Sequence, residues 1–448
     1  RLYSGSYNED ETYPYSASWR VCMLLQVGGD GGSGGGVGGS NVAMWFARPE
    51  AGQDGTTYLR QTDRLQLSGF EAGFVLRDGQ VRLRDRVVDH DPKRFVLRIN
   101  DPEANKNPGP GNDSIRARIV TFDEAGRLLD QGNEVTLKEK PDSEGSFWSE
   151  YLLLVAHPDD DKFPLDVADN GLDDRTFLAE LGGRIRAIYK GTSVDAPVPV
   201  EYTLKINLIQ VRDQAGIPPD GELSSWARNN VIEAGYILAP LGIRLDVLQG
   251  RGDPARNISP DRYPFPEVKD PPQRVDLTNG LDLSGEVDHD GKFLPTGELH
   301  NLLISYRPHE EKVLQVYIIN YFASVSPGLR QLVEPVPVGL AFPLRSIANP
   351  AVANAVILAG VPDRAFEGGF QVIKNRNVLA HEIVHVLLNN PPNISDHVDP
   401  RIEVNRVNLM VPVATNEDFR GSQLNPRRLF ENQITEVLRS QLLVKAGS

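Results

Sequence analysis

Five consecutive residues, His381-Glu382-Ile383-Val384-His385, constrain the fold more than any other segment of the chain. The two histidines are four residues apart, and side chains at that spacing meet on one face of an α-helix. Residues 375–388 around them are largely apolar, and Pro391 and Pro392 follow, which cannot continue a helix. We therefore expect a buried helix that presents both imidazoles to a cleft.

The same helix is suited to a catalytic metal site. Imidazole nitrogens are common zinc ligands, and zinc lowers the pKa of a bound water to about 7. Glu382 follows the first histidine, a position from which a glutamate can take a proton from that water. We expect His381 and His385 to bind Zn²⁺ and Glu382 to act as general base and then as general acid.

A catalytic zinc site needs a third protein ligand and leaves its fourth position open. Three side chains downstream of the helix could supply that ligand. His397 lies beyond the proline pair, Asp396 is its neighbour, and Glu403 lies eighteen residues after His385. We favour His397 and keep Asp396 and Glu403 as alternatives.

The order of these residues resembles the metzincin clan of zinc endopeptidases. The resemblance rests on the His381–His385 segment, on a later histidine and on Asn408-Leu409-Met410. In that clan a methionine turn lies beneath the metal, and Met410 matches the position of its methionine. The resemblance implies an α+β catalytic domain over residues 198–448 and a protein or peptide substrate. It also implies a cleft bounded by an edge strand, to which the substrate adds as a further strand.

The sequence departs from the clan after the second histidine. Metzincins usually have glycine three residues after that histidine and the third histidine three residues further on. Leu388 and Pro391 occupy those positions here, and His397 comes twelve residues after His385. The connection is longer than the clan's pattern, so the spacing leaves the third ligand open.

Other segments of residues 198–448 fit an α+β domain. Apolar residues at helical spacing predict helices over residues 222–241 and 429–444. Short apolar runs predict strands over residues 243–248 and 313–322.

The first half of the chain has the pattern of β-structure. Short apolar or alternating runs bounded by Gly, Pro, Asn or Asp recur between residues 20 and 211 and predict strands of β-sandwiches. Residues 95–190 resemble an immunoglobulin-like β-sandwich repeat of bacterial cell-surface proteins, mainly through Ile99–Asn105 and Val135–Glu139. We expect two all-β modules, residues 1–93 and 94–197, ahead of the catalytic domain.

Oxygen-bearing side chains gather where the second module begins. Asp101, Asn105 and Asp113 could bind Ca²⁺ through these oxygens. The alternative is that they form turns by accepting hydrogen bonds from nearby backbone, and we favour this alternative.

Charge and composition limit the partners of the chain. Acidic residues outnumber basic ones by 61 to 47, which gives a net charge of −14, so we expect no nucleic-acid partner. No apolar run reaches the length of a membrane span. Cys22 is the single cysteine, which excludes an internal disulfide.

The two resemblances together suggest a bacterial protein that is secreted or held at the cell surface. The rival to the protease hypothesis is a non-proteolytic surface or adhesion protein that retains a zinc-binding domain. An intact Glu382 favours the protease.

Overall fold

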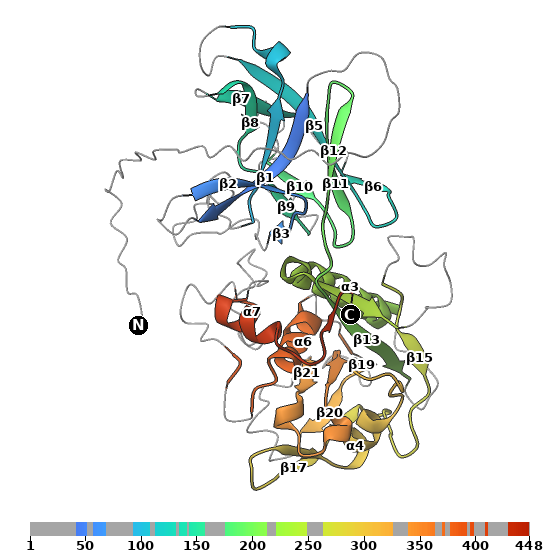
Figure 1. Ribbon diagram of the computed structural model, residues 1–448. Coiled ribbons are helices and arrows are strands. Elements are labelled where there is room, and N and C mark those ends of the chain that lie inside the picture. Colours follow the sequence, from blue (N-terminus) through green and yellow to red (C-terminus); the bar gives the residue numbers. More distant parts are fainter. Residues whose placement is uncertain are drawn as a thin grey trace, which may run out of the picture.

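The structure is a computed structural model of the chain, mostly β with few helices (Figure 1). It describes residues 42–51, 57–68, 93–107, 113–130, 134–140, 143–156, 175–212, 221–248, 263–325, 339–362, 370–371, 377–391, 395–397, 408–410 and 429–447. Cys22 and Glu403 lie outside these ranges.

Nine strands of the N-terminal half form one antiparallel sheet (Figure 1). Across the sheet they are β12 (Thr192–Pro197), β11 (Arg184–Tyr189), β5 (Ser114–Phe122), β7 (Glu134–Lys140), β8 (Ser143–Ser149), β4 (Val96–Asn100), β1 (Ala43–Ala51) and β2 (Thr57–Thr62), with β6 (Leu128–Asp130) paired to β5. Side chains alternate between the two faces. Along β7, Val135 and Leu137 are buried, whereas Glu134 and Lys138 are exposed. One face of the sheet therefore lines a core and the other faces solvent.

A second, smaller sheet shares that core. Its strands are β10 (Thr176–Leu178), β9 (Leu153–Val155) and β3 (Leu67–Ser68), paired in parallel. Leu67, Leu154 and Phe177 belong to the same hydrophobic cluster as Phe46 and Phe147 of the larger sheet.

The structure differs here from the expected division into modules at residues 93 and 94. Strand β1, which precedes that point, pairs with β4, which follows it, and Trp45 lies opposite Arg98. Phe46 and Leu97 belong to one cluster. Strands from both expected modules thus build a single sheet and core, because antiparallel pairing joins segments that are distant in sequence.

The C-terminal half contains a seven-stranded mixed sheet. Its main path is β14 (Ile243–Val247), β13 (Tyr202–Val211), β19 (Val313–Ile319), β22 (Ala355–Ala359) and β21 (Gly339–Phe342), and β15 (Glu267–Lys269) and β25 (Val444–Lys445) also pair with β13. The strands of the main path are parallel except β21, which is antiparallel to β22 and ends the path. This edge strand is the part of the sheet that bears on the site described below.

Helices cover both faces of this sheet. They are α3 (Gly221–Leu238), α4 (Gly297–Ile304), α6 (Val378–Leu388) and α7 (Glu431–Val437). Along β19, Leu314 and Val316 join the cluster that contains α3 and α6, whereas Tyr317 and Ile319 join the cluster that contains α4. The strand is buried on both faces, which explains its mostly apolar sequence, broken only by the buried Gln315.

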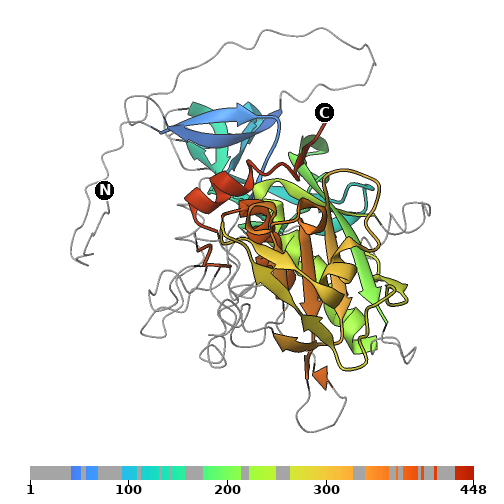
Figure 2. The same cartoon turned by 90° about the horizontal axis from the view of Figure 1, so that it is seen from below.

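Short elements complete the described part. They are the pairs β16 (Leu281–Leu283) with β20 (Phe322–Val325), β17 (Gly285–Val287) with β18 (Phe293–Pro295) and β23 (Val361–Pro362) with β24 (Phe370–Gln371), and the 3₁₀ turns η1 (Pro102–Ala104), η3 (Ala239–Leu241), η5 (Leu344–Ser346) and η6 (Pro350–Val352). Helix α7 packs against α6 (Figures 1 and 2). Among the residues described, no helix has both the length and the apolar character needed to cross a membrane.

Candidate metal centre

Helix α6 carries the segment that the sequence singled out. Leu379, Ile383, Val384 and other apolar residues of the helix are fully buried in the cluster shared with α3 and the sheet. The backbone N–H of Leu379, in the first turn, donates to Oδ1 of Asn230 on α3 at 3.1 Å. This contact supplies an acceptor to a helix start whose first N–H groups have none within the helix.

The C-terminal end of α6 turns the chain back. Asn389 has a left-handed backbone conformation with φ of 49°, and its N–H still bonds to the carbonyl of His385. Asparagine tolerates this conformation better than most residues, and it commonly ends helices in this way. The polypeptide can therefore return toward the histidine face before reaching His397.

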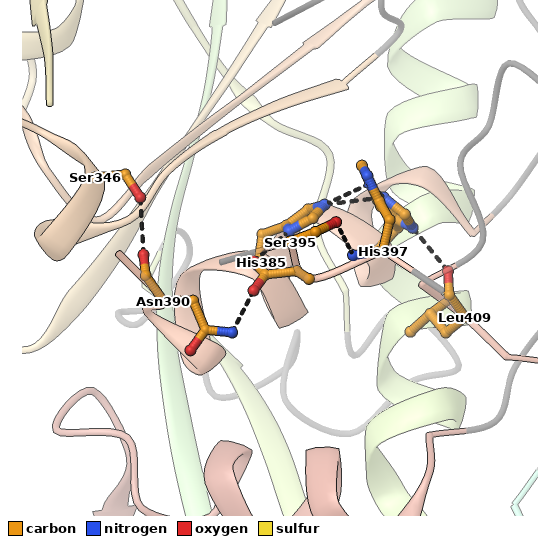
Figure 3. Close-up of polar contacts among 8 residues, drawn as sticks. Ser346, His385, Asn390, Ser395, His397 and Leu409 are labelled. Carbon is orange, nitrogen blue, oxygen red and sulfur yellow. Dashed lines mark hydrogen bonds and ion pairs between the residues drawn. The ribbon is translucent and has the colours of Figure 1, made fainter. Parts of the chain in front are cut away.

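Three imidazoles meet beyond this turn (Figure 3). The Nε2 atoms of His381 and His397 are 3.2 Å apart, and Nε2 of His385 is 3.1 Å from each of them. Three nitrogens bound to one tetrahedral zinc with bonds of about 2.0–2.1 Å lie about 3.3 Å apart. The triangle is close to that size, so this group could hold a metal ion.

The opposite ring nitrogens are fixed by acceptors. Nδ1 of His381 is 2.7 Å from the carbonyl oxygen of Leu409, and Nδ1 of His385 is 2.7 Å from Oδ2 of Asp396 (Figure 3). A carbonyl or carboxylate oxygen accepts, so each Nδ1 carries the proton and donates it. Each Nε2 then offers its lone pair to the centre of the triangle, as a ligand to a metal must.

Asp396 acts on His385 from outside the triangle. While Oδ2 accepts from His385, Oδ1 accepts from the side-chain amide of Asn390. The carbonyl of Asn390 in turn accepts from the Ser346 hydroxyl at 2.9 Å (Figure 3). From the sequence we considered Asp396 as an alternative metal ligand. In the structure its carboxylate instead accepts a hydrogen bond from His385.

Burial favours the neutral forms of His381 and His397. Burial, followed by the charge of His385, keeps the pKa of His381 well below its usual value. Burial and His385 also lower the pKa of His397 to about 4. Neutral imidazole is the form that binds metals, so these two rings are ready for coordination at neutral pH. Burial raises the pKa of Glu382 to about 7.

Comparison with known proteins adds little to this geometry. No family model and no curated protein sequence matches the chain. Metalloproteinase-II from Bacteroides fragilis is a weak structural neighbour, with 12% identity and a TM-score of 0.26 over 78% of this chain and 82% of that one. Similarity at this level supports no assignment, so the site has to be judged on its own residues.

Met410 lies in a turn that supports His381. Its side chain is fully buried in the cluster that contains α6, and its N–H donates to Oδ1 of Asn408 at 2.8 Å. The side-chain amide of Asn408 donates to Oε1 of Gln433 on α7, also at 2.8 Å. Helix α7 therefore holds the turn whose Leu409 carbonyl orients His381. Sequence analysis did not identify Gln433, because a hydrogen bond between distant segments leaves no local pattern.

Gly339 of β21 lies against the Glu382 side chain. A Cβ atom added at Gly339 would stand 2.7 Å from both Cγ and Oε1 of Glu382 and 2.8 Å from Cγ1 of Val378. These separations are far below van der Waals contact, so only glycine leaves room for the carboxylate in its observed position. The edge strand and the predicted general base are thereby in direct contact.

The Gly339→Ala variant should lose activity without losing metal. The new methyl group would displace the Glu382 carboxylate, and a misplacement of about 1 Å at a catalytic group can cost about 100-fold in rate. Peptide hydrolysis and bound zinc would be measured on the same preparation. A variant as active as wild type would show that Glu382 does not need its observed position.

The side chains predicted to bind calcium have protein partners. Oδ2 of Asp101 accepts from Lys190 Nζ at 2.7 Å and from the Tyr189 hydroxyl at 2.8 Å. Oδ2 of Asp113 accepts from the backbone N–H of Lys106 at 2.6 Å. Asn105 lies beside Asp113, its side-chain nitrogen 3.2 Å from Oδ2. The backbone contact of Asp113 fits the turn-forming alternative, whereas the contacts of Asp101 join segments distant in sequence, and calcium stays a prediction.

Asp101→Ala should destabilise the N-terminal half by roughly 1–3 kcal/mol, because a buried acceptor of two side-chain donors is lost. Although burial opposes it, hydrogen bonds from Lys190 and Tyr189 keep the pKa of Asp101 below its usual value. Its contribution is thus present above the unfolded pKa of about 3.9 and disappears as pH falls through the folded pKa. Urea unfolding of both proteins at pH 7 and pH 3 would measure this. Stabilisation of wild type alone by millimolar calcium would favour the calcium interpretation instead.

Proposed function

We propose that this chain is a zinc-dependent endopeptidase of metzincin type. The observation that carries the proposal is the meeting of the Nε2 atoms of His381, His385 and His397 within 3.1–3.2 Å of one another. Glu382 extends from the same helix and is buried against the edge strand β21. Two of the three candidate ligands and a proton acceptor are thus held on one helix.

Zinc is the ion that this donor set suits best. Three imidazoles with no cysteine or carboxylate in the triangle resemble the three-histidine catalytic zinc sites, which keep one position for water or substrate. Calcium and magnesium prefer oxygen ligands and would be poorly held.

Different residues of this chain would have different roles in peptide hydrolysis. When bound, zinc would supply Lewis acidity that polarises the attacking water and the scissile carbonyl. Glu382 would accept the proton of that water and then donate it to the leaving amine. Leu409 and Asp396 would keep the rings of His381 and His385 in the tautomer that the site requires.

The edge strand supports a peptide as the substrate. Within the described residues β21 pairs with β22 alone and ends the path of the sheet. An extended peptide could add there through main-chain hydrogen bonds, with its scissile bond near Glu382. Gly339 belongs to this strand and contacts Glu382, which links substrate alignment to the catalytic group.

Cleavage of a mixed peptide library, followed by mass spectrometry, tests the proposal. The purified chain should cut internal peptide bonds, stop when the metal is removed with a chelator, and resume when zinc is added back. Binding of about one zinc per chain without any cleavage would contradict the endopeptidase and leave the adhesion-protein alternative. Cleavage that survives complete metal removal would refute the metal mechanism.

A further inference from the structure

The carboxylate of Asp396 is held from two sides. Its Oδ2 accepts from Nδ1 of His385 at 2.7 Å, and its Oδ1 accepts from the side-chain amide of Asn390. The side chain of Asp396 is 9% exposed and that of His385 is 16% exposed, so little water competes for these contacts. Rotation of the carboxylate about its Cβ–Cγ bond would break both hydrogen bonds, so the direction of each oxygen is fixed.

Asn390 is itself anchored through its backbone. Its carbonyl accepts from the Ser346 hydroxyl at 2.9 Å, while its side chain donates to Asp396 (Figure 3). The preceding residue, Asn389, accepts at Oδ1 from the backbone N–H of Arg345 at 2.8 Å. Both contacts attach the end of α6 to η5, which follows the edge strand β21. Asn390 therefore presents its amide to Asp396 from a backbone that is held on the opposite side.

The segment that carries His397 depends on the contacts of its neighbour Asp396. Among the described residues, the polar contacts of residues 395–397 with the rest of the chain are made to the two histidines of α6 and to Asn390. The contacts of His397 join Nε2 atoms, and in the form that binds a metal each of these nitrogens is an acceptor. Acceptors do not attract one another, so the two hydrogen bonds of Asp396 are what hold this segment before a metal binds.

We propose that Asn390 is a positioning residue of the metal centre, which acts through Asp396 on two of the three ligands. By holding Oδ1, Asn390 directs Oδ2 at Nδ1 of His385 and sets the orientation of that ring. Because Asp396 and His397 are consecutive, the same hydrogen bond places the backbone from which His397 reaches the triangle. This inference rests on the metal site proposed above and adds to it a residue outside the triangle.

A role for Asn390 in filling space is the alternative, and two substitutions distinguish it from positioning. Leucine has the branching and the number of side-chain heavy atoms of asparagine but no donor. Asn390→Leu should bind zinc about tenfold more weakly than wild type, at the lower end of the range for a partner that orients a ligand. Asn390→Ala should have the same effect. Wild-type affinity in Asn390→Leu would overturn the proposal, whatever the affinity of Asn390→Ala.

Repeating the substitution in the Asp396→Ala chain shows whether Asn390 acts through Asp396. Residues that belong to one hydrogen-bond network have effects that do not add. Asn390→Leu should cost about tenfold in the wild-type chain and leave the zinc affinity of Asp396→Ala unchanged. Zinc affinity is measured on the full-length chain by competition with a chelator, and circular dichroism checks that each variant is folded. Asn390→Ala takes the place of Asn390→Leu if the leucine variant does not fold.

An asparagine of η6 supplies the matched control. Oδ1 of Asn349 accepts from the backbone N–H of Ala351 at 3.0 Å. Asn349→Leu removes a side-chain hydrogen bond of the same residue type and should bind zinc as wild type does. Cobalt(II) in place of zinc adds a spectroscopic measurement, because its visible absorption depends on coordination geometry. The spectrum should change in Asn390→Leu and stay that of wild type in Asn349→Leu.

The proposal is overturned if Asn390→Leu weakens zinc binding by the same factor with and without the Asp396 carboxylate. An Asn390→Leu chain whose cobalt spectrum equals that of wild type would overturn it as well, since the ligands would then keep their geometry. Failure of the endopeptidase proposal gives a different result. In that case the wild-type chain binds zinc without cleaving peptides, and the effect of Asn390 on zinc affinity is still measured.

Discussion

The Glu382→Gln variant should hold zinc as wild type does and hydrolyse peptides about 1,000-fold more slowly. Glutamine has the same shape as glutamate but cannot accept the proton of the attacking water. General acid–base catalysis typically contributes about 100- to 10,000-fold, and a 1,000-fold loss corresponds to about 4 kcal/mol of barrier. Glu382 is 6% exposed, and its carboxylate contacts Gly339, so a substitution of equal size avoids repacking. The measurement is kcat/KM on a peptide found in the library screen, with zinc quantified by elemental analysis.

A second glutamate provides the control for this variant. Glu436 is exposed on α7, and its carboxylate pairs with Arg439 at 2.7 Å. Glu436→Gln should leave kcat/KM unchanged. Full activity of Glu382→Gln with zinc bound would mean that another group accepts the proton. Loss of zinc together with activity would instead give Glu382 a role in holding the site.

Helix α6 could be predicted from the sequence because the evidence for it is local. The spacing of His381 and His385, the apolar residues between them and the prolines beyond all lie within about four turns of helix. The same holds for β19, whose mostly apolar sequence reflects burial on both faces of the sheet. Patterns of this kind depend on each residue's immediate surroundings, and these surroundings are encoded nearby in the chain.

The way His397 reaches the triangle could not be predicted from such patterns. The chain after α6 is held by contacts with η5, where the backbone N–H of Arg345 donates to Oδ1 of Asn389 at 2.8 Å and Ser346 donates to the carbonyl of Asn390. These partners are separated by 44 residues in sequence. The acceptor for Nδ1 of His381 is the backbone carbonyl of Leu409. Every residue has such a carbonyl, so the residue type gives no indication of this contact.

The C-terminal segment differs from its predicted structure because it pairs with a distant strand. The apolar pattern predicts a helix over residues 429–444, but α7 ends at Val437. Beyond it, Val444 and Lys445 form β25, which pairs with β13. Pairing with β13 provides hydrogen-bond partners for the backbone of Val444 and Lys445 that further helical turns would otherwise provide. The spacing of apolar residues alone does not distinguish a longer helix from this added strand.

The His397→Ala variant should lose zinc far more readily than any variant of the residues that only orient the ligands. Removing one of three protein ligands leaves two imidazoles of α6, which cannot enclose a tetrahedral ion. Removal of a partner that orients a ligand typically costs about 10–100-fold in metal affinity. Asp396→Ala should fall in that range, because Asp396 contacts Nδ1 of His385 rather than the centre of the triangle. Zinc affinity would be measured by competition with a chelator, and circular dichroism would check that each variant is folded.

The comparison of these two variants decides among the ligands that the sequence left open. A larger loss for His397→Ala than for Asp396→Ala would assign His397 as the ligand and Asp396 as the group that orients His385. Equal, severe losses would make Asp396 a ligand as well. Full zinc retention by His397→Ala would require another ligand, and Glu403→Gln then tests the remaining alternative. His397 and Asp396 are adjacent in sequence and both contact His385. The zinc affinities of the variants therefore decide which of the two is the third ligand.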